Sequence, residues 1–234
     1  APWAGAPWTP RRWQVEALPK IGEALRCGER TVVSAATGSG KAILLTEVAH
    51  LFARGMPDDE CVVITTPTQA LVRQLAETVA ARVGAASVGV YYGRAKQPDR
   101  PIVVSCNPSL ANLHVALAMA ARKVRLLIAD EVHGTEGRIL RDVIPQIAPK
   151  HAVGFTATPF RSAKEESLSL WQSLAFRYDF SDALRDRVLV PWRVANWDGT
   201  GDADTDLVCA DLIERHGRGP GIVSATSIED ADAY

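Results

Sequence analysis

The stretch that most constrains the fold is residues 31–55, where an apolar run leads through a glycine turn and a lysine into a helical pattern. Residues 31–34 predict a strand, and residues 43–54 predict a helix that ends at Gly55. Backbone N–H groups in such a turn, together with the helix dipole, favour a bound phosphate. Lys41 adds a positive charge for the β- and γ-phosphates of a nucleotide. The predicted nucleotide-binding residues of the turn are Thr37, Gly38, Ser39, Gly40, Lys41 and Ala42.

Ala42 departs from a complete phosphate site. In turns of this kind Ser or Thr usually follows the lysine, because its hydroxyl ligates the Mg²⁺ that accompanies the nucleotide. Ala42 carries no side-chain oxygen, and the hydroxyls of Thr37 and Ser39 precede the lysine, so we do not assume that they replace the missing ligand. Nucleotide binding is therefore expected, whereas efficient hydrolysis is not.

Unbroken apolar runs follow this turn and alternate with helical patterns. Such runs are typical of strands that are buried on both faces of a sheet. The predicted strands are residues 61–66, 87–92, 102–105, 124–129 and 152–156, the last of the series, with helices at about 70–79 and 108–121. This alternation predicts an α/β fold with a doubly wound parallel sheet, which binds ligands at the carboxyl ends of its strands.

Composition narrows the classes of protein. The formal net charge is −1, so a nucleic-acid site would have to be a local basic patch. The four cysteines show no CxxC spacing, which favours reduced thiols over disulfides or zinc. The longest apolar run, residues 115–121, is shorter than the roughly 20 residues of a membrane span, and no signal-peptide pattern is present. We therefore expect a cytoplasmic location.

A second chemical motif, Asp130-Glu131-Val132-His133, directly follows the apolar run at residues 124–129. An acidic residue at a strand end can hold Mg²⁺, directly or through water. A neighbouring carboxylate can orient and deprotonate a water aimed at the γ-phosphate. Two acids after a strand are by themselves compatible with a solvated turn, but the phosphate turn upstream favours the catalytic interpretation.

Taken with Thr156-Ala157-Thr158-Pro159 and the following Phe160-Arg161, the ordered motifs resemble the first motor lobe of a superfamily 2 helicase of the DExH type. The resemblance is closest to the motor subunits of restriction enzymes, the ResIII-like branch. It spans residues 11–161 and continues more weakly to about residue 231. It implies a RecA-like P-loop NTPase lobe that uses ATP and Mg²⁺ and couples ATP hydrolysis to movement on DNA or RNA.

The resemblance also implies roles for individual residues. Arg11 would pack on the adenine and Gln14 would read its edge, while Asp130 would hold Mg²⁺ through water and Glu131 would act as the catalytic base, beside Lys41. The residues expected to couple the nucleotide to lobe movement are His133, Thr156 and Thr158.

A nucleic-acid contact surface is implied in the same way, with DNA favoured over RNA. Contacts of this kind go to sugar and phosphate, so binding independent of base sequence is expected. No aromatic stacking platform stands out, and each segment is also compatible with a capped helix start. The implied contact residues are Thr66, Pro67, Gln69, Arg73, Gly93 (with Arg94 and Lys96 nearby), Ser105, Asn107 and Ser109.

The predicted domain organisation is an extended arm at residues 1–10, a motor lobe at 11–178, a linker at 179–206 and the incomplete beginning of a second RecA-like lobe at 207–234. Two other functions stay open. The chain could be a nucleotide-gated nucleic-acid-binding module with impaired hydrolysis because of Ala42 and an incomplete second lobe. It could also be an unrelated P-loop enzyme such as a kinase, although the threonine motif and Gln14 argue against that.

Overall fold

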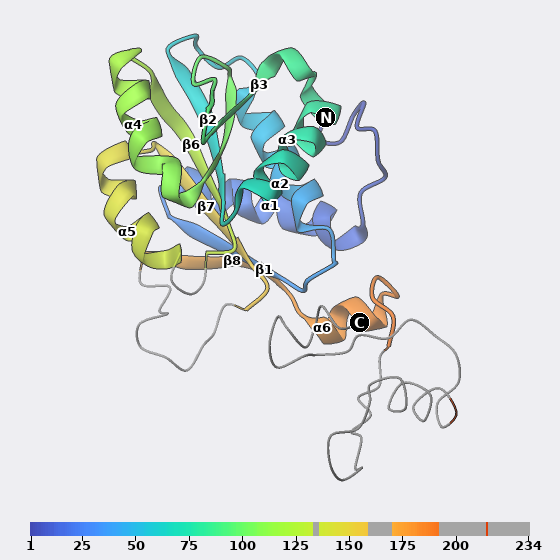
Figure 1. Cartoon of the computed structure of the whole chain (residues 1–234). Helices are drawn as coiled ribbons and strands as arrows, with labels where there is room; N and C mark the ends of the chain where they lie inside the picture. Colours follow the sequence, from blue (N-terminus) through green and yellow to red (C-terminus); the bar gives the residue numbers. More distant parts are fainter. Residues whose placement is uncertain (133–135, 159–169, 192–213, 215–234) are drawn as a thin grey trace. The chain divides into compact units, whose positions relative to one another are not determined.

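A computed structural model of the chain describes residues 1–132, 136–158, 170–191 and 214 (Figure 1). The chain divides into two compact units, Ala1–Leu189 and Val190–Tyr234, and the helices and strands below all belong to the first. The predicted beginning of a second lobe, residues 207–234, lies outside the described residues except for residue 214, as do His133, Phe160 and Arg161. The predicted domain boundaries stay a prediction.

One eight-stranded sheet forms the centre of the first unit, in the order β4-β3-β5-β2-β6-β7-β1-β8. Every neighbouring pair is parallel except β3 and β4, which form an antiparallel hairpin at one edge. This topology confirms the predicted α/β fold with a mostly parallel sheet. The strands are β1 Thr31–Ala35, β2 Glu60–Thr66, β3 Val88–Tyr92, β4 Ala95–Lys96, β5 Ile102–Cys106, β6 Lys123–Asp130, β7 His151–Thr156 and β8 Ser173–Tyr178.

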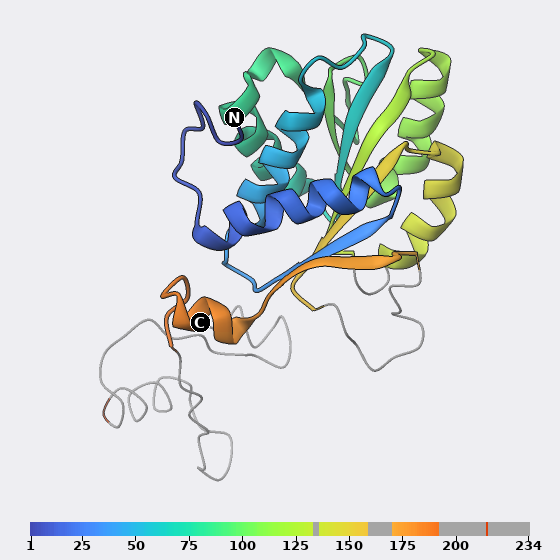
Figure 2. The same ribbon diagram turned by 180° about the vertical axis from the view of Figure 1, so that it is seen from behind.

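Helices cover both faces of the sheet, as expected for a doubly wound fold. Figures 1 and 2 show α1, α2 and α3 on one face and α4 and α5 on the other. Each layer encloses its own apolar core, one around Trp13, Leu44 and Phe155 and one around Leu113, Leu127 and Leu140. The helices are α1 Arg12–Arg26, α2 Lys41–Ala53, α3 Gln69–Val83, α4 Leu110–Met119, α5 Glu136–Ile147 and α6 Phe180–Arg185, with single 3₁₀ turns at Ala85–Ser87 and Asn107–Ser109.

Strand β8 lies beyond the predicted series, which ended at residue 156. It pairs in parallel with β1 at the edge of the sheet, opposite the β3–β4 hairpin. Only Tyr178 among its residues is buried, because an edge strand has one side open to solvent. It therefore lacks the unbroken apolar run that marked the buried strands, such as β1 and β5, in which every residue is buried.

The N-terminal residues form turns that pack on the lobe. The backbone N–H of Trp3 donates a hydrogen bond of 2.8 Å to the Glu47 carboxylate on α2, and its ring packs against the core on the α1–α2 face. Glu47 also forms a buried ion pair with Arg82 of α3. Among the described residues, no helix is both long enough and apolar enough to cross a membrane. The thiols of Cys61 and Cys106 are buried, as predicted for β-strand positions, and Cys27 is exposed.

Candidate nucleotide and nucleic-acid site

The strand order sorts the predicted site residues into two neighbouring groups. Apart from Arg11 and Gln14 at the start of α1, the nucleotide-site residues lie at the ends of β1, β6 and β7, which are adjacent in the sheet. The nucleic-acid residues lie at or just beyond the ends of β2, β3 and β5, which are also adjacent. Because these strands are parallel, all six carboxyl ends open at the same edge of the sheet. Motifs more than 100 residues apart are therefore brought together on one side of the lobe.

The phosphate-binding loop, residues 36–40, joins β1 to the first turn of α2. Gly38 and Gly40 have φ angles of +77° and +96°, which residues with a Cβ rarely adopt. A Cβ would also be crowded at both positions, lying 3.2 Å from Cδ2 of Leu189 at Gly38 and 3.0 Å from Nε2 of Gln14 at Gly40. The loop thus needs both glycines for its conformation and for its packing.

The first turn of α1 holds this loop through its carbonyl oxygens. Nη1 of Arg11 donates to the carbonyls of Gly38 (3.3 Å) and Ser39 (2.5 Å), and Nε2 of Gln14 donates to Gly40 (2.9 Å). The other end of the Gln14 amide accepts the Arg11 backbone N–H at 2.8 Å, which caps the helix. The structure therefore brings both predicted adenine contacts to the loop, and their role toward the base stays a prediction.

Trp13 also contacts the loop, a role that no sequence motif indicated. Its indole N–H donates to the Ser39 carbonyl at 3.2 Å, from a side chain that is only 2% exposed. The available signal was an aromatic residue directly before Gln14, but a large apolar residue at the start of a helix more often indicates core packing.

Lys41 and Glu131 meet although they are 90 positions apart in the chain. The Lys41 ammonium lies 3.5 Å from Oε1 of Glu131 and donates to the carbonyl of Ala35 at 3.2 Å. Glu131 has a φ of +53°, a left-handed conformation that is uncommon for residues other than glycine and concentrates at functional sites. The predicted lysine and the predicted base thus share one site at the ends of β1 and β6.

Asp130 carries a buried carboxylate that the protein satisfies only in part. Its Oδ1 atom is buried and has no hydrogen-bond partner among the described residues. Burial, together with the charge of Glu131, raises the pKa of Asp130 to about 6, although Lys41 opposes the shift. An orphaned carboxylate oxygen beside a lysine fits a place where Mg²⁺ and its waters are held.

No group of three or more metal-binding side chains occurs in the part of the chain that the structure describes. Ala42, exposed in the first turn of α2, adds no oxygen. Mg²⁺ commonly binds through one or two carboxylates and the phosphates of its substrate, and a single carboxylate such as Asp130 is compatible with that mode of binding. The donor set therefore fits a metal that arrives with a nucleotide rather than one bound alone.

The threonine motif, residues 156–159, follows β7 and begins between the Asp130–Glu131 pair and the phosphate-binding loop. Thr156 is fully buried at the end of β7, in register with Ser34 of β1, and its hydroxyl accepts the backbone N–H of Thr158 at 3.1 Å. Since β7 separates β6 from β1, Thr156 stands between Asp130 and the phosphate-binding loop. The relay role of Thr156 and Thr158 stays a prediction.

On the nucleic-acid side, α3 starts directly beyond β2. Thr68 caps this helix, accepting the backbone N–H of Leu71 at 3.4 Å, and Thr66 is buried with its hydroxyl bonded to the carbonyl of Thr68. Gln69 and Arg73 are exposed and Pro67 is half-buried. A helix start with exposed polar side chains suits the phosphate contacts predicted here.

The β3–β4 hairpin lies beside this helix start and adds aromatic and basic side chains. Nε of Arg73 donates to the hydroxyl of Tyr92 at 3.0 Å, and the Lys96 ammonium lies 4.0 Å from the ring centre of Tyr91. Gly93 makes the turn with a φ of +47°. Two basic side chains are thus held over tyrosine rings at the predicted contact, although the sequence suggested no aromatic platform.

Ser105 and Asn107 are more deeply placed than a surface contact would be. Both are at most 1% exposed. The Ser105 hydroxyl donates to the carbonyl of Tyr91 at 2.8 Å, and Oδ1 of Asn107 accepts from the Thr65 hydroxyl at 2.5 Å. In this structure both residues fix the ends of β2, β3 and β5, and Ser109, which is half-buried, lies nearest the surface of the three.

The sequence matches a known protein family over most of the first unit. The family described as "Type III restriction enzyme, res subunit" matches residues 8–161. The chain belongs to this family. The matched segment contains the phosphate-binding loop, the Asp130–Glu131 pair and the threonine motif, so this family member carries the lobe of a superfamily 2 helicase-type ATPase. No curated protein matches the chain.

Solved structures support the fold. The chain is similar to the UvsW helicase from bacteriophage T4 (15% identity, TM-score 0.52, covering 67% of this chain and 58% of that one). It is also similar to the Type ISP restriction-modification enzyme LlaGI in complex with a DNA substrate mimic (16%, 0.62, 89% and 22%). A third is the Sulfolobus solfataricus SWI2/SNF2 ATPase core in complex with dsDNA (14%, 0.59, 73% and 36%). The chain thus spans from about a fifth to rather more than half of these proteins.

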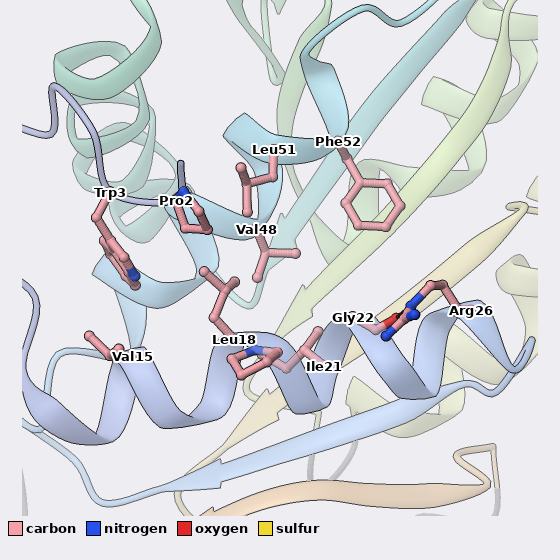
Figure 3. Close-up of a pocket in the computed structure, with 11 residues that line it drawn as sticks. Pro2, Trp3, Val15, Leu18, Ile21, Gly22, Arg26, Val48, Leu51 and Phe52 are labelled. Atoms are coloured by element: carbon pink, nitrogen blue, oxygen red, sulfur yellow. Dashed lines mark hydrogen bonds between the residues drawn. The ribbon is translucent and has the colours of Figure 1, made fainter.

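This res-family lobe also has an apolar cavity of about 580 Å³ that is separate from the nucleotide site. Figure 3 shows it lined by N-terminal residues, α1 and α2, including Trp3, Leu18, Val48 and Phe52, with Arg26 the one charged residue of its lining. None of its lining residues belongs to the phosphate-binding loop. The cavity is therefore a packing feature of the α1–α2 face rather than part of the site above.

Proposed function

We propose that this chain is the nucleotide-binding lobe of an ATP-dependent helicase or translocase of the DExH type, which couples ATP hydrolysis to movement on nucleic acid. The observation that carries the proposal is the meeting of Lys41 and Glu131 at 3.5 Å, beside the orphaned oxygen of Asp130 and the two-glycine loop. A structural turn would not need a strained glutamate and an unpaired buried carboxylate oxygen in the same place.

The residues divide the chemistry among them. The loop N–H groups and Lys41 bind the β- and γ-phosphates, Asp130 would hold Mg²⁺, and Glu131 orients the attacking water and takes its proton. When bound, Mg²⁺ neutralises charge that develops on the phosphate oxygens. Arg11 and Gln14 fix the loop and contact the adenine side of the nucleotide.

The nucleic-acid partner is proposed to be DNA, bound through its backbone. The exposed start of α3 and the β3–β4 hairpin supply Arg73, Arg94 and Lys96 as local cations on a chain whose net charge is −1. Two of the similar structures contain DNA or a DNA substrate mimic, which supports DNA for this chain as well. Contacts with phosphates position a protein without reading sequence.

The binding test is a titration of mixed-sequence DNA duplex, single strand and RNA. Affinity should be insensitive to base sequence and should fall steeply between about 50 and 200 mM salt. Arg73→Ala should reduce the slope of log affinity against log salt by about 1. Lys123→Ala is the matched control, because Lys123 is an exposed lysine at the opposite end of β6, paired with Asp59. A flat salt response or a strong preference for one sequence would contradict the proposal.

Ala42 favours a second candidate, a nucleotide-gated binding module that holds ATP and nucleic acid but hydrolyses ATP poorly. Lys41 and the loop N–H groups still hold the phosphates, so binding survives the loss of a hydroxyl ligand. Turnover depends more strongly on the metal, because phosphoryl transfer relies on positioning and charge neutralisation.

Restoring the hydroxyl with Ala42→Thr separates the two candidates. Steady-state ATP hydrolysis is compared with and without nucleic acid in a protein that carries a complete second lobe. The resemblance implies that the second lobe supplies an arginine finger, an arginine that stabilises the transition state and is worth about 10³–10⁵ in rate in related enzymes. Metal stabilisation of the transition state amounts to several kcal/mol, so we expect at least a roughly tenfold faster turnover at similar ATP affinity. If the alanine protein already hydrolyses ATP as fast and responds to nucleic acid, the binding-module candidate loses its support.

A further inference from the structure

Trp13, a buried aromatic residue, contacts both the phosphate-binding loop and β8. We propose that Trp13 is a positioning residue: its indole N–H fixes the Ser39 carbonyl, and its ring ties the loop to Tyr178 of β8. The inference rests on the proposed nucleotide binding and adds a residue that touches neither phosphate nor base.

The first observation is the hydrogen bonding of Ser39. Its carbonyl oxygen accepts from both Arg11 (2.5 Å) and Trp13 (3.2 Å), which uses its two lone pairs. An oxygen held toward α1 cannot turn to face a bound phosphate, where it would repel the negative charge. The two donors differ in setting, since Arg11 is an exposed side chain while Trp13 is buried with its ring packed. Trp13 therefore adds a fixed second donor that restricts the direction of this carbonyl.

The second observation is the aromatic stack behind Trp13. Its ring lies 5.0 Å from the ring centre of Tyr178 with the planes 12° apart, and 6.4 Å from Phe176 with the planes 22° apart. Offset stacks of this kind are worth more than the area that they bury, and a ring has few torsions to fix. The indole N–H is thus aimed at the loop by side chains of β8.

The third observation is that the same segment touches the loop twice more. The carbonyl of Tyr178 accepts the backbone N–H of Ala36 at 3.0 Å, and Leu189, just beyond α6, lies against Gly38. The Tyr178 hydroxyl in turn donates to Asp186 at 3.2 Å, which joins the end of β8 to the end of α6. A change in the loop on nucleotide binding would therefore be felt by the segment from Ser173 to Leu189.

The test uses Trp13→Phe, which keeps an aromatic ring in the stack and removes only the N–H donor and part of the ring area. Trp8→Phe is the matched control, because Trp8 lies in the same N-terminal stretch and its indole N–H is buried with no hydrogen-bond partner among the described residues. Two quantities are measured in each: ADP affinity by calorimetry and stability by urea unfolding.

A neutral hydrogen bond contributes modestly, so Trp13→Phe should weaken ADP binding about 2- to 10-fold. Trp8→Phe should keep the wild-type affinity. A purely structural Trp13 would lower the urea midpoint and leave the ADP affinity of the remaining folded protein at the wild-type value.

Wild-type ADP affinity in Trp13→Phe would overturn the inference while leaving the proposed function intact, provided that wild type binds ADP and Lys41→Ala does not. If wild type itself fails to bind ADP, the proposed function and the inference fail together.

Discussion

Helix α2 carries two charged clusters, one partly exposed around Lys41 and Glu131 and one buried around Glu47 and Arg82, and they differ in how well their polar atoms are satisfied. At its first residue, Lys41 lies 3.5 Å from Glu131, close to an Asp130 oxygen without a hydrogen-bond partner. Six residues later, Glu47 accepts hydrogen bonds from Trp3 N–H and from two nitrogens of Arg82, at 2.8 to 3.1 Å. The first cluster is incomplete, and the second is complete.

The difference shows in the pKa values. Burial would raise the pKa of Glu47, but the hydrogen bonds from Arg82 and Trp3 and the charge of Arg82 outweigh burial, and its pKa is lowered. For Asp130 burial prevails and the pKa is raised to about 6. Removing one partner of a buried charge that the protein satisfies destabilises the fold, whereas a buried charge left unsatisfied points to a ligand.

The largest expected effect is on stability, from breaking the complete cluster. Glu47→Ala leaves the Arg82 guanidinium, whose side chain is 5% exposed, buried without its partner. Losing one member of a buried pair costs about 3–5 kcal/mol, so the free energy of unfolding in urea should fall by that amount. The N-terminal turns should loosen as well, because Trp3 loses its acceptor.

The matched control for Glu47→Ala is Glu16→Ala, which breaks the Arg12–Glu16 pair, whose side chains are 75% and 50% exposed. It should cost less than about 1 kcal/mol. Nucleotide affinity of the folded Glu47→Ala protein should stay near that of wild type. A loss of affinity as large as that of a phosphate-site variant would contradict the separation of the two clusters.

Lys41→Ala should show the reverse pattern and a somewhat smaller free energy. A charge-assisted contact to phosphate is worth about 1.5–3 kcal/mol, so ATP affinity measured by calorimetry should fall by roughly 10- to 150-fold. Stability should change by less than about 1 kcal/mol, because the ammonium makes only a 3.5 Å ion pair and a 3.2 Å hydrogen bond in the protein. Equal ATP affinity in both proteins would refute the phosphate site.

Much of this first cluster could be predicted from sequence because its residues are local to recognisable strand ends. The loop and the Asp130–Glu131 pair each follow a buried strand, and parallel strands necessarily bring such ends together. The family match over residues 8–161 agrees with the resemblance drawn from these motifs. Strand β8 was not predicted from the sequence because this edge strand has no unbroken apolar run. Its pairing with β1 also joins residues about 140 positions apart, which no local pattern indicates.

The second cluster, Glu47 with Arg82 and Trp3, could not be predicted because its members are also far apart in the sequence. In the sequence, Glu47 is an ordinary polar residue within an apolar helical pattern. No nearby residue indicates that Arg82 and the Trp3 N–H will contact it in the fold. Trp13 was likewise indistinguishable from a core residue until the Ser39 carbonyl was placed beside it. Satisfaction of a polar group is a property of tertiary packing, so a sequence locates motifs better than it locates their support.

The smallest expected effect is the contribution of Glu47 to the pH dependence of stability. The pKa of Glu47 is lower in the folded state than its ordinary value of about 4.3, so its ionised form stabilises the fold. That contribution is fully present above the unfolded pKa and is lost as the pH falls through the folded one. The charged or titratable groups facing Glu47 are Arg82 of α3 and His50 of α2, and burial lowers the pKa of His50, which keeps it mostly neutral near pH 7.

Glu47→Gln keeps the shape of the side chain but cannot ionise, so it isolates this contribution. Wild type should be more stable than Glu47→Gln at pH 7, and the difference in unfolding free energy should shrink as the pH falls from about 5 toward 3. Only the difference between the folded and unfolded pKa contributes, which makes the effect smaller than the loss in Glu47→Ala. Urea titrations at a series of pH values measure it. A difference that stays constant with pH would mean that Glu47 titrates alike in both states, and the contrast with Asp130 would then rest on geometry alone.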